Sequence, residues 1–211
     1  TMFNLSPPAD EHEVCQLGTL DLSNVGDELR RVYSDGSGGA YSSIPQLRRC
    51  GWSWVLIGPK EDLIFARYSP LEGPLQTVPR SELAAVIDIL GHMPCGLALE
   101  ITLDARTVQR TASKIHALDR IDKAKAEGHP ALFSDNGDLW ADFLQALQQR
   151  TATTSFVWCK SHATHLQLWS GFISRVAFIG NTYADAFAGQ AAAMHQTTDE
   201  DKASFDIIMG R

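Results

Sequence analysis

The order of the β-prone and helix-prone segments is the feature that most constrains the fold of this chain. Three apolar segments rich in β-branched and aromatic residues come first, separated by Gly, Pro and Ser, as in a strand meander. Helical spacing begins only after them, and from there helices alternate with single strands. This order predicts an α/β fold with a five-stranded mixed sheet, in which an antiparallel three-strand meander is joined by two parallel strands and flanked by helices. The expected strands are 31–34, 51–57, 62–68, 97–103 and 153–159, and the expected helices are centred on 83–90, 108–118, 136–147 (with Asn136 as N-cap) and 183–193.

The two ends of the chain lack such patterns. Residues 1–28 have no sustained period and contain Pro7-Pro8 and many acidic residues, so we expect a loose extension or linker. Residues 196–211 are polar and predict a flexible C-terminal tail. Between them, we expect 29–195 to form one domain, since a chain of 211 residues can bury one substantial core. The start at Thr1 suggests that the chain was cut from something longer.

Composition excludes several classes of protein. The formal net charge of −7 argues against a protein that holds nucleic acid by indiscriminate positive charge, although bound metal ions would supply positive charge of their own. No apolar run approaches the ~20 residues of a membrane helix, and no basic region precedes an apolar segment at the N-terminus, so we expect neither a membrane span nor a signal peptide. The scattered cysteines form no C-x-x-C pair, which favours reduced thiols in the cytoplasm or nucleus without deciding between them.

Four acidic residues occur where strands end or helices begin. Asp35 ends the first strand and Asp104 closes the fourth. Glu82 lies in the first turn of the first helix, and Asp185 lies near the start of the last one. Each alone is explained by helix capping or by the helix dipole. Because such positions gather at one rim of an α/β sheet, the four together favour carboxylates that converge on divalent cations.

Six short segments, in this order, resemble the type 1 ribonucleases H, including the domains attached to reverse transcriptases of retroelements. The resemblance extends from about residue 30 to 193. Its matching pieces are YSDGS (33–37), RSELA (80–84), ITLD (101–104) with Val108, NGDLW (136–140), VWCKSH (157–162) and NTYADAFA (181–188).

This resemblance implies an endonuclease that hydrolyses the RNA strand of RNA/DNA hybrids by means of two Mg²⁺ ions ~4 Å apart, for which Mn²⁺ would substitute. By the same resemblance, Asp35 would bridge both ions. Asp185 would help to hold the ion that activates water, while Glu82 and Asp104 would hold the ion that stabilises the leaving oxygen. His162 matches the family's mobile histidine, which is thought to aid proton movement or product release.

The resemblance also names the molecules that the protein would contact. The RNA/DNA hybrid is the expected substrate, and Gly36, Ser37 and Asn181 are expected to contact it. A reverse transcriptase domain of the same polyprotein is the expected protein partner.

Three features depart from the family pattern. Val78-Pro79 stand where many relatives carry asparagines that contact the minor groove of the hybrid, where 2′-hydroxyls mark RNA. Ser161 replaces the glycine that usually precedes the histidine. The segment between His162 and Asn181 is much longer than in most relatives, and its apolar residues follow a helical period. We expect this insert, 163–180, to pack as an extra helix on the core; docking against a neighbouring domain is the alternative.

Two other functional classes remain open. One is a non-catalytic ribonuclease H-like module that binds nucleic acid or serves as a structural domain of a polyprotein; loss of a metal carboxylate would mark such a copy, and none of the four is lost. The other is a different nuclease or an integrase-like enzyme, since a fold does not fix a function. The 181–185 element and the His162 loop favour ribonuclease H over the latter.

Overall fold

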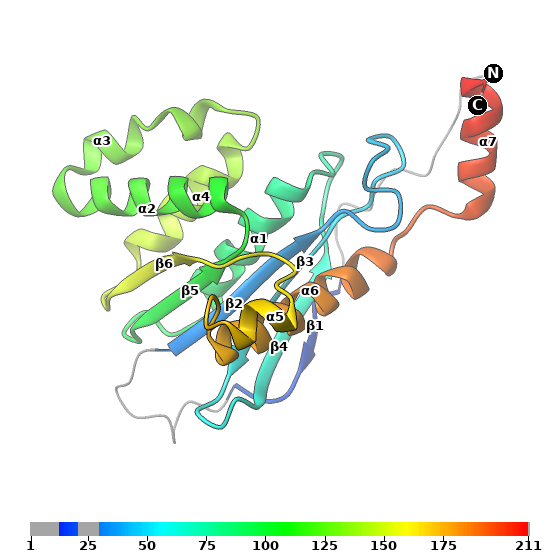
Figure 1. Cartoon of the computed structure of the whole chain (residues 1–211). Coiled ribbons are helices and arrows are strands. Elements are labelled where there is room, and N and C mark those ends of the chain that lie inside the picture. Colours follow the sequence, from blue (N-terminus) through cyan, green and yellow to red (C-terminus); the bar gives the residue numbers. More distant parts are fainter. Residues whose placement is uncertain (1–12, 21–29, 211) are drawn as a thin grey trace.

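A mixed β-sheet organises the computed structural model, which describes residues 13–20 and 30–210 (Figure 1). The strand order is β1-β4-β3-β2-β5-β6. The strands are β1 (Cys15–Leu17), β2 (Arg30–Ser37), β3 (Gly51–Ile57), β4 (Leu63–Pro70), β5 (Leu99–Leu103) and β6 (Thr154–Trp158). The helices are α1 (Val78–His92), α2 (Arg106–Ile121), α3 (Lys123–Glu127), α4 (Gly137–Gln148), α5 (His165–Trp169), α6 (Arg175–Ala193) and α7 (Asp199–Met209), with a 3-10 turn η1 (Pro130–Phe133).

The sheet combines antiparallel and parallel pairing as predicted. Strands β2, β3 and β4 form an antiparallel meander, because short connections can join only antiparallel neighbours. Strand β5 then pairs parallel to β2, and β6 pairs parallel to β5. These parallel pairs need the crossover connections that α1 and the α2–α4 segment provide. The predicted α/β fold is confirmed.

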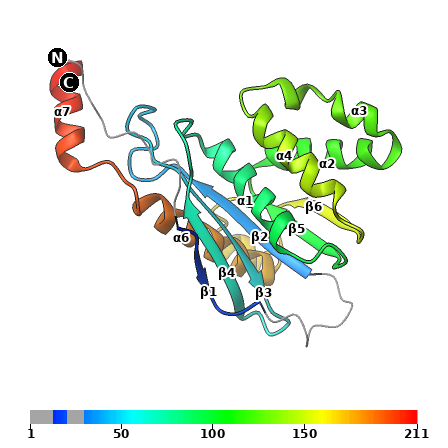
Figure 2. The ribbon, with the colours of Figure 1, turned by 180° about the vertical axis from the view of Figure 1, so that it is seen from behind.

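Helices cover both faces of the sheet, α1, α2 and α4 on one side and α6 on the other (Figures 1 and 2). The larger core lies under α1, α2 and α4, where each fully buried Leu, Ile or Phe contributes ~1.5–3 kcal/mol. Its members include Val32, Trp54, Phe65, Leu83, Ile89, Ile101, Ile115, Phe143 and Phe156.

The smaller core lies between α6 and β2–β4, where the helix presents small residues to the sheet. Tyr33, Val55 and Ala66 are buried there against Ala184. Gly180 lets the helix approach closely, because a Cβ at this position would overlap the ring of Tyr33. The alanine-rich face of α6 therefore brings the helix, and with it Asp185, close to the strands.

The sheet has six strands rather than the predicted five. Strand β1 comes from the segment expected to be a loose extension, and it pairs antiparallel with the edge of β4, where Gln16 lies opposite Arg67. A three-residue strand is too short to show an alternating pattern in the sequence, whereas the unpaired edge of β4 offers it a row of hydrogen-bonding groups. The rest of that segment, residues 1–12 and 21–28, lies outside the described residues.

Two helices differ from the sequence-based expectation. Residues Asp199–Met209 form α7 where a flexible tail was predicted; Thr198 and Asp201 make a capping box at its start. Helix α6 begins at Arg175 rather than near residue 183, with Ser174 as its N-cap. Asn136 precedes α4 as expected, but its side chain makes no capping hydrogen bond.

Within residues 13–20 and 30–210, none of the helices combines the length and the apolar character needed to cross a bilayer. The four cysteines, Cys15, Cys50, Cys95 and Cys159, are free thiols.

Candidate active site

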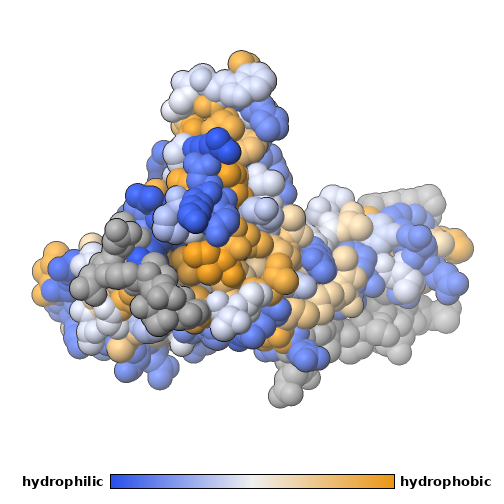
Figure 3. All heavy atoms as spheres, turned by 90° about the horizontal axis from the view of Figure 1, so that it is seen from below, coloured by the Kyte–Doolittle hydropathy of each residue, from blue (hydrophilic) through white to orange (hydrophobic). Residues whose placement is uncertain are grey.

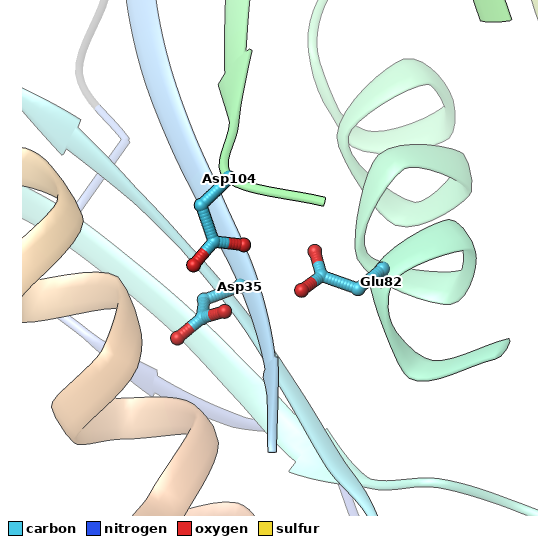
Figure 4. A group of neighbouring side chains, drawn as sticks. All are labelled: Asp35, Glu82 and Asp104. Carbon is cyan, nitrogen blue, oxygen red and sulfur yellow. The ribbon is translucent and has the colours of Figure 1, made fainter. Parts of the chain in front are cut away.

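Three of the four predicted carboxylates converge at one rim of the sheet (Figure 4). Asp35 comes from β2, Glu82 from the first turns of α1, and Asp104 from the residue after β5. One oxygen from each lies within 4.8 Å of the others. The parallel pairing of β2 with β5 brings the two aspartates together, since it sets the preceding residues Ser34 and Leu103 side by side.

Glu82 reaches this rim because α1 packs unusually close to β2. A Cβ at Gly36 would overlap Ser81 Oγ and lie 2.7 Å from the Glu82 backbone nitrogen, so glycine is what permits the approach. Val78-Pro79 open α1, where the missing N–H of proline costs nothing. The close approach of α1 thus accounts for the glycine without a ligand, and substrate contact at Gly36 stays a prediction.

Burial and mutual repulsion hold protons on these carboxyl groups. Burial, followed by the charges of Asp104 and Asp185, raises the pKa of Asp35 to about 8, although the Gly36 N–H donates to its Oδ1 at 2.9 Å and opposes the shift. Burial and the charges of Asp35 and Asp104 raise the pKa of Glu82 well above its usual range. The pKa of Asp104 is also raised, mainly by burial. A cation at the cluster would remove this repulsion.

The donor set fits a hard divalent cation. Glu82 is 2% exposed, and its Oε2 atom is buried without a hydrogen-bond partner. A buried carboxylate oxygen left unpaired is costly, and a bound cation would satisfy it. Three carboxylates offer only oxygen ligands, as Mg²⁺ and Mn²⁺ prefer.

Asp185 lies beside this cluster rather than within it. It is in the middle of α6, not near its start, because the helix begins earlier than predicted. Its side chain is 48% exposed, and Oδ2 lies 3.9 Å from Nδ1 of His162. Its negative charge contributes to the raised pKa values of Asp35 and Asp104.

His162 projects from the loop between β6 and α5. Its side chain is 77% exposed, and its backbone is left-handed with φ of 44°, which is uncommon for a residue other than glycine. Ser161, which replaces the usual glycine, is the residue just before it. The structure thus sets an exposed imidazole beside Asp185.

Asn181 and Ser37 have mainly structural contacts in the protein. Asn181 is 6% exposed, and its Oδ1 accepts a hydrogen bond from Cys159 Sγ at 3.3 Å, which ties α6 to the base of the His162 loop. Ser37 Oγ accepts from the Gly39 N–H at 3.3 Å. Their contact with substrate stays a prediction.

Sequence reasoning missed Ser53, which anchors α6 behind the cluster. It lies opposite Asp35 in the β2–β3 register, and its Oγ donates to the Ala184 carbonyl at 2.6 Å. This buried bond fixes the helix next to Asp185. The available signal was a single hydroxyl within the otherwise apolar strand 51–57.

The insert 163–180 packs on the core only in part. Ile173 is buried, and Val176 and Ile179 pack against the smaller core, as expected. Trp169 and Phe172, by contrast, are 79% and 62% exposed. The predicted extra helix is therefore a short α5 followed by an extension of α6.

The chain matches a protein family by sequence and several solved structures by fold. The family model for RNase H matches residues 28–193. A comparison with curated proteins gave no sequence match. Among solved structures, LC9-RNase H1, described as a type 1 RNase H with the type 2 active-site motif, is 21% identical, with 80% of this chain and 74% of that one aligned and a TM-score of 0.55.

Foamy virus structures give a similar result. The PFV RNase H domain is 16% identical, with 78% of this chain and 94% of that one aligned and a TM-score of 0.54. The foamy viral protease-reverse transcriptase in complex with an RNA/DNA hybrid is 17% identical, with a TM-score of 0.53; the match covers 79% of this chain but 20% of that longer one. These similarities support the fold, and the family match spans most of the sequence: the chain belongs to the RNase H family.

Proposed function

We propose that this protein is a ribonuclease H that hydrolyses the RNA strand of RNA/DNA hybrids with two divalent metal ions. The convergence of Asp35, Glu82 and Asp104 from three separate segments carries the proposal. Nothing in the packing of the fold requires three carboxyl groups with raised pKa values to meet at one buried point. Such clusters of perturbed groups are typical of functional sites.

The four carboxylates would hold different metal ions. Asp35 and Asp104 both feel the charge of Asp185, whereas Glu82 feels those of Asp35 and Asp104. By the family resemblance, Asp35 would bridge the two ions, with Glu82 and Asp104 at one of them and Asp185 at the other. Bound Mg²⁺, or Mn²⁺ in its place, would activate water and stabilise the leaving oxygen. His162, exposed beside Asp185, would accept or donate a proton at the edge of the site.

Replacement of Asp35 tests this proposal directly. We expect Asp35→Asn to abolish cleavage of a labelled RNA/DNA hybrid in Mg²⁺ while it leaves the fold and most hybrid binding intact, because only the charge is lost. Chelation by EDTA should stop the wild-type enzyme in the same assay. Asp142→Asn, which changes an exposed carboxylate on α4, is the matched control and should keep full activity.

The outcome separates the alternatives. Near-normal turnover by Asp35→Asn would refute the mechanism. Hybrid binding without cleavage by the wild-type protein would instead identify a non-catalytic binding domain. Cleavage of DNA duplex as fast as the hybrid would indicate another nuclease on the same fold.

We further propose a reverse transcriptase domain as the protein partner. The observation that favours it is the match of this chain to 20% of the longer foamy virus protease-reverse transcriptase chains. Joining the two domains in one polypeptide and comparing its hybrid cleavage with that of the separate domains tests the pairing; equal rates would count against it.

A further inference from the structure

The insert forms one wall of a pocket on the α6 side of the sheet. Helix α6 packs on β2, β3 and β4, and beyond it the ends of β5 and β6 face a hollow of about 510 Å³. In Figure 1 the segment with α5 lies in front of the sheet. Figure 3, which views the molecule from below, shows hydrophobic residues (orange) gathered at the base of the part that extends to the top of the picture. The pocket is lined by Arg31, Glu100, Val157, Trp158, Lys160 and Phe172, among others.

The wall of this pocket that the insert supplies is aromatic and open. Phe172 is 62% exposed, so its ring presents surface to a ligand. Trp158 also lines the pocket, but its ring is turned toward the start of α2: the guanidinium of Arg106 lies over it, 4.9 Å from its centre, and the indole N–H donates to the Asp104 carbonyl. Phe172 therefore offers the pocket a ring for stacking.

The charge around the pocket favours an anion. The chain has 25 acidic residues, yet none occurs between Asp142 and Asp185, the stretch that supplies β6, the His162 loop and the insert. Lys160 and Arg31 both line the pocket, and Glu100, the acidic residue that lines it, is paired with Arg31 at 3.3 Å. Lys160 is thus an additional positive charge in a protein whose net charge is −7.

The pocket is connected to the candidate active site by a short piece of chain. Cys159 and Lys160 line it, and His162 follows two residues later. The pocket and the candidate active site therefore share the chain segment that follows β6.

We infer that this pocket binds an unpaired nucleobase from a single-stranded extension of the substrate. The volume is within the range of small-ligand sites, ~300–1,000 Å³. An exposed aromatic ring beside a positive charge is a usual means of holding single-stranded nucleic acid, because every base has a face to stack. The inference rests on the proposed function for the identity of the strand, but its binding test does not.

Binding of a labelled oligothymidylate in EDTA tests the pocket apart from catalysis. Fluorescence anisotropy should detect binding by the wild-type protein, and Phe172→Ala should weaken it by about tenfold, as expected for loss of one stacked base. Lys160→Gln should weaken it less at high salt than at low salt. Trp169→Ala is the matched control, because that ring is also exposed on the insert but does not line the pocket; its affinity should be unchanged.

A second experiment links the pocket to the substrate. Wild-type protein should bind a hybrid with a single-stranded overhang more tightly than a blunt one, and Phe172→Ala should lose this preference while it cleaves the blunt hybrid normally. Failure of the wild-type protein to cleave the blunt hybrid would remove the proposed function and leave the oligothymidylate result standing.

Three results would overturn the inference. One is equal oligothymidylate affinity for the wild-type protein and Phe172→Ala. The second is an equal loss in Phe172→Ala and Trp169→Ala, which would indicate a generally adhesive surface. The third is self-association of the wild-type protein that Phe172→Ala abolishes without any oligothymidylate binding, which would identify a second copy as the occupant.

Discussion

Asp35 is buried among like charges, and this conflict makes the stability of the metal-free protein depend on pH. The pKa of Asp35 is raised to about 8 in the folded protein, mainly by burial, from ~3.9 in an unfolded chain. The folded state therefore binds this proton more tightly, so the stabilisation is fully present below pH ~4 and is lost as pH rises through 8. Glu82 and Asp104, whose pKa values are also raised, act in the same direction.

We therefore expect the free energy of unfolding of the protein in EDTA to fall between pH 5 and pH 8.5. Asp35→Asn should reduce this fall and be more stable than wild type at the upper end, while Asp142→Asn should follow wild type. By the proposed function, Mg²⁺ should restore the stability of the wild-type protein at pH 8, because a ligand that binds only the folded state stabilises it. Urea unfolding at a series of pH values measures all three, and parallel curves for wild type and Asp35→Asn would disprove the argument.

The exposed position of His162 leads to a prediction about turnover. Its imidazole is exposed and faces Asp185, so it can move protons without contributing to the core. We expect His162→Ala to lower multiple-turnover cleavage on the order of 100-fold and to change hybrid affinity much less. His165→Ala, at the start of α5 with its ring centre 5.2 Å from that of Phe178, should have little effect on turnover. Equal losses of binding and turnover in His162→Ala would refute this role.

Among the secondary-structure elements, α6 owes its position to the absence of a side chain at one point. Gly180 faces Tyr33 so closely that Gly180→Ala should lower the free energy of unfolding by ~1–3 kcal/mol through overpacking. Gly189 lies on the same helix with nothing within 4 Å, so Gly189→Ala should raise it by ~0.5–1 kcal/mol. Denaturant unfolding of both variants measures the difference; two equal changes would show that the close contact is absent.

In the insert we expect a large side chain to contribute little to stability, because Trp169 lies outside the core. Trp169→Ala should change the free energy of unfolding by less than ~0.5 kcal/mol. Trp140→Ala, which removes a 6% exposed ring that packs edge-on against Phe143, should cost ~3–5 kcal/mol. Thermal and urea unfolding of the two variants compare them, and a large loss for Trp169→Ala would mean that the ring is buried in solution.

These elements also show what could be predicted from the sequence. The packing of α1 against the β-prone meander could be predicted, because each has one apolar face that must be buried. The period of the insert indicated helix, but a stripe does not specify the surface that covers it, so the exposure of Trp169 could not be foreseen. Strand β1 was missed since three residues carry no period.

On the scale of the whole molecule, the four carboxylates could be named from their positions at strand ends and helix starts, whereas their unequal burial could not. That difference depends on how α1 and α6 approach β2, and it is set by Gly36 and Ser53, residues with no carboxylate of their own. The pocket beside the insert likewise arises from segments far apart in the sequence.

The assembly of the carboxylate cluster from β2, α1 and the end of β5 has a consequence for protein synthesis. Asp35 leaves the ribosome early, but the other two carboxylates of the cluster are not both present until Asp104 has emerged and β5 can pair with β2. A nascent chain therefore has no assembled carboxylate cluster until Asp104 has been added and has left the ribosome. Local opening of α1 or β5 in the mature protein would separate the same carboxylates, so the proposed binding of metal would report on the completion and integrity of the sheet.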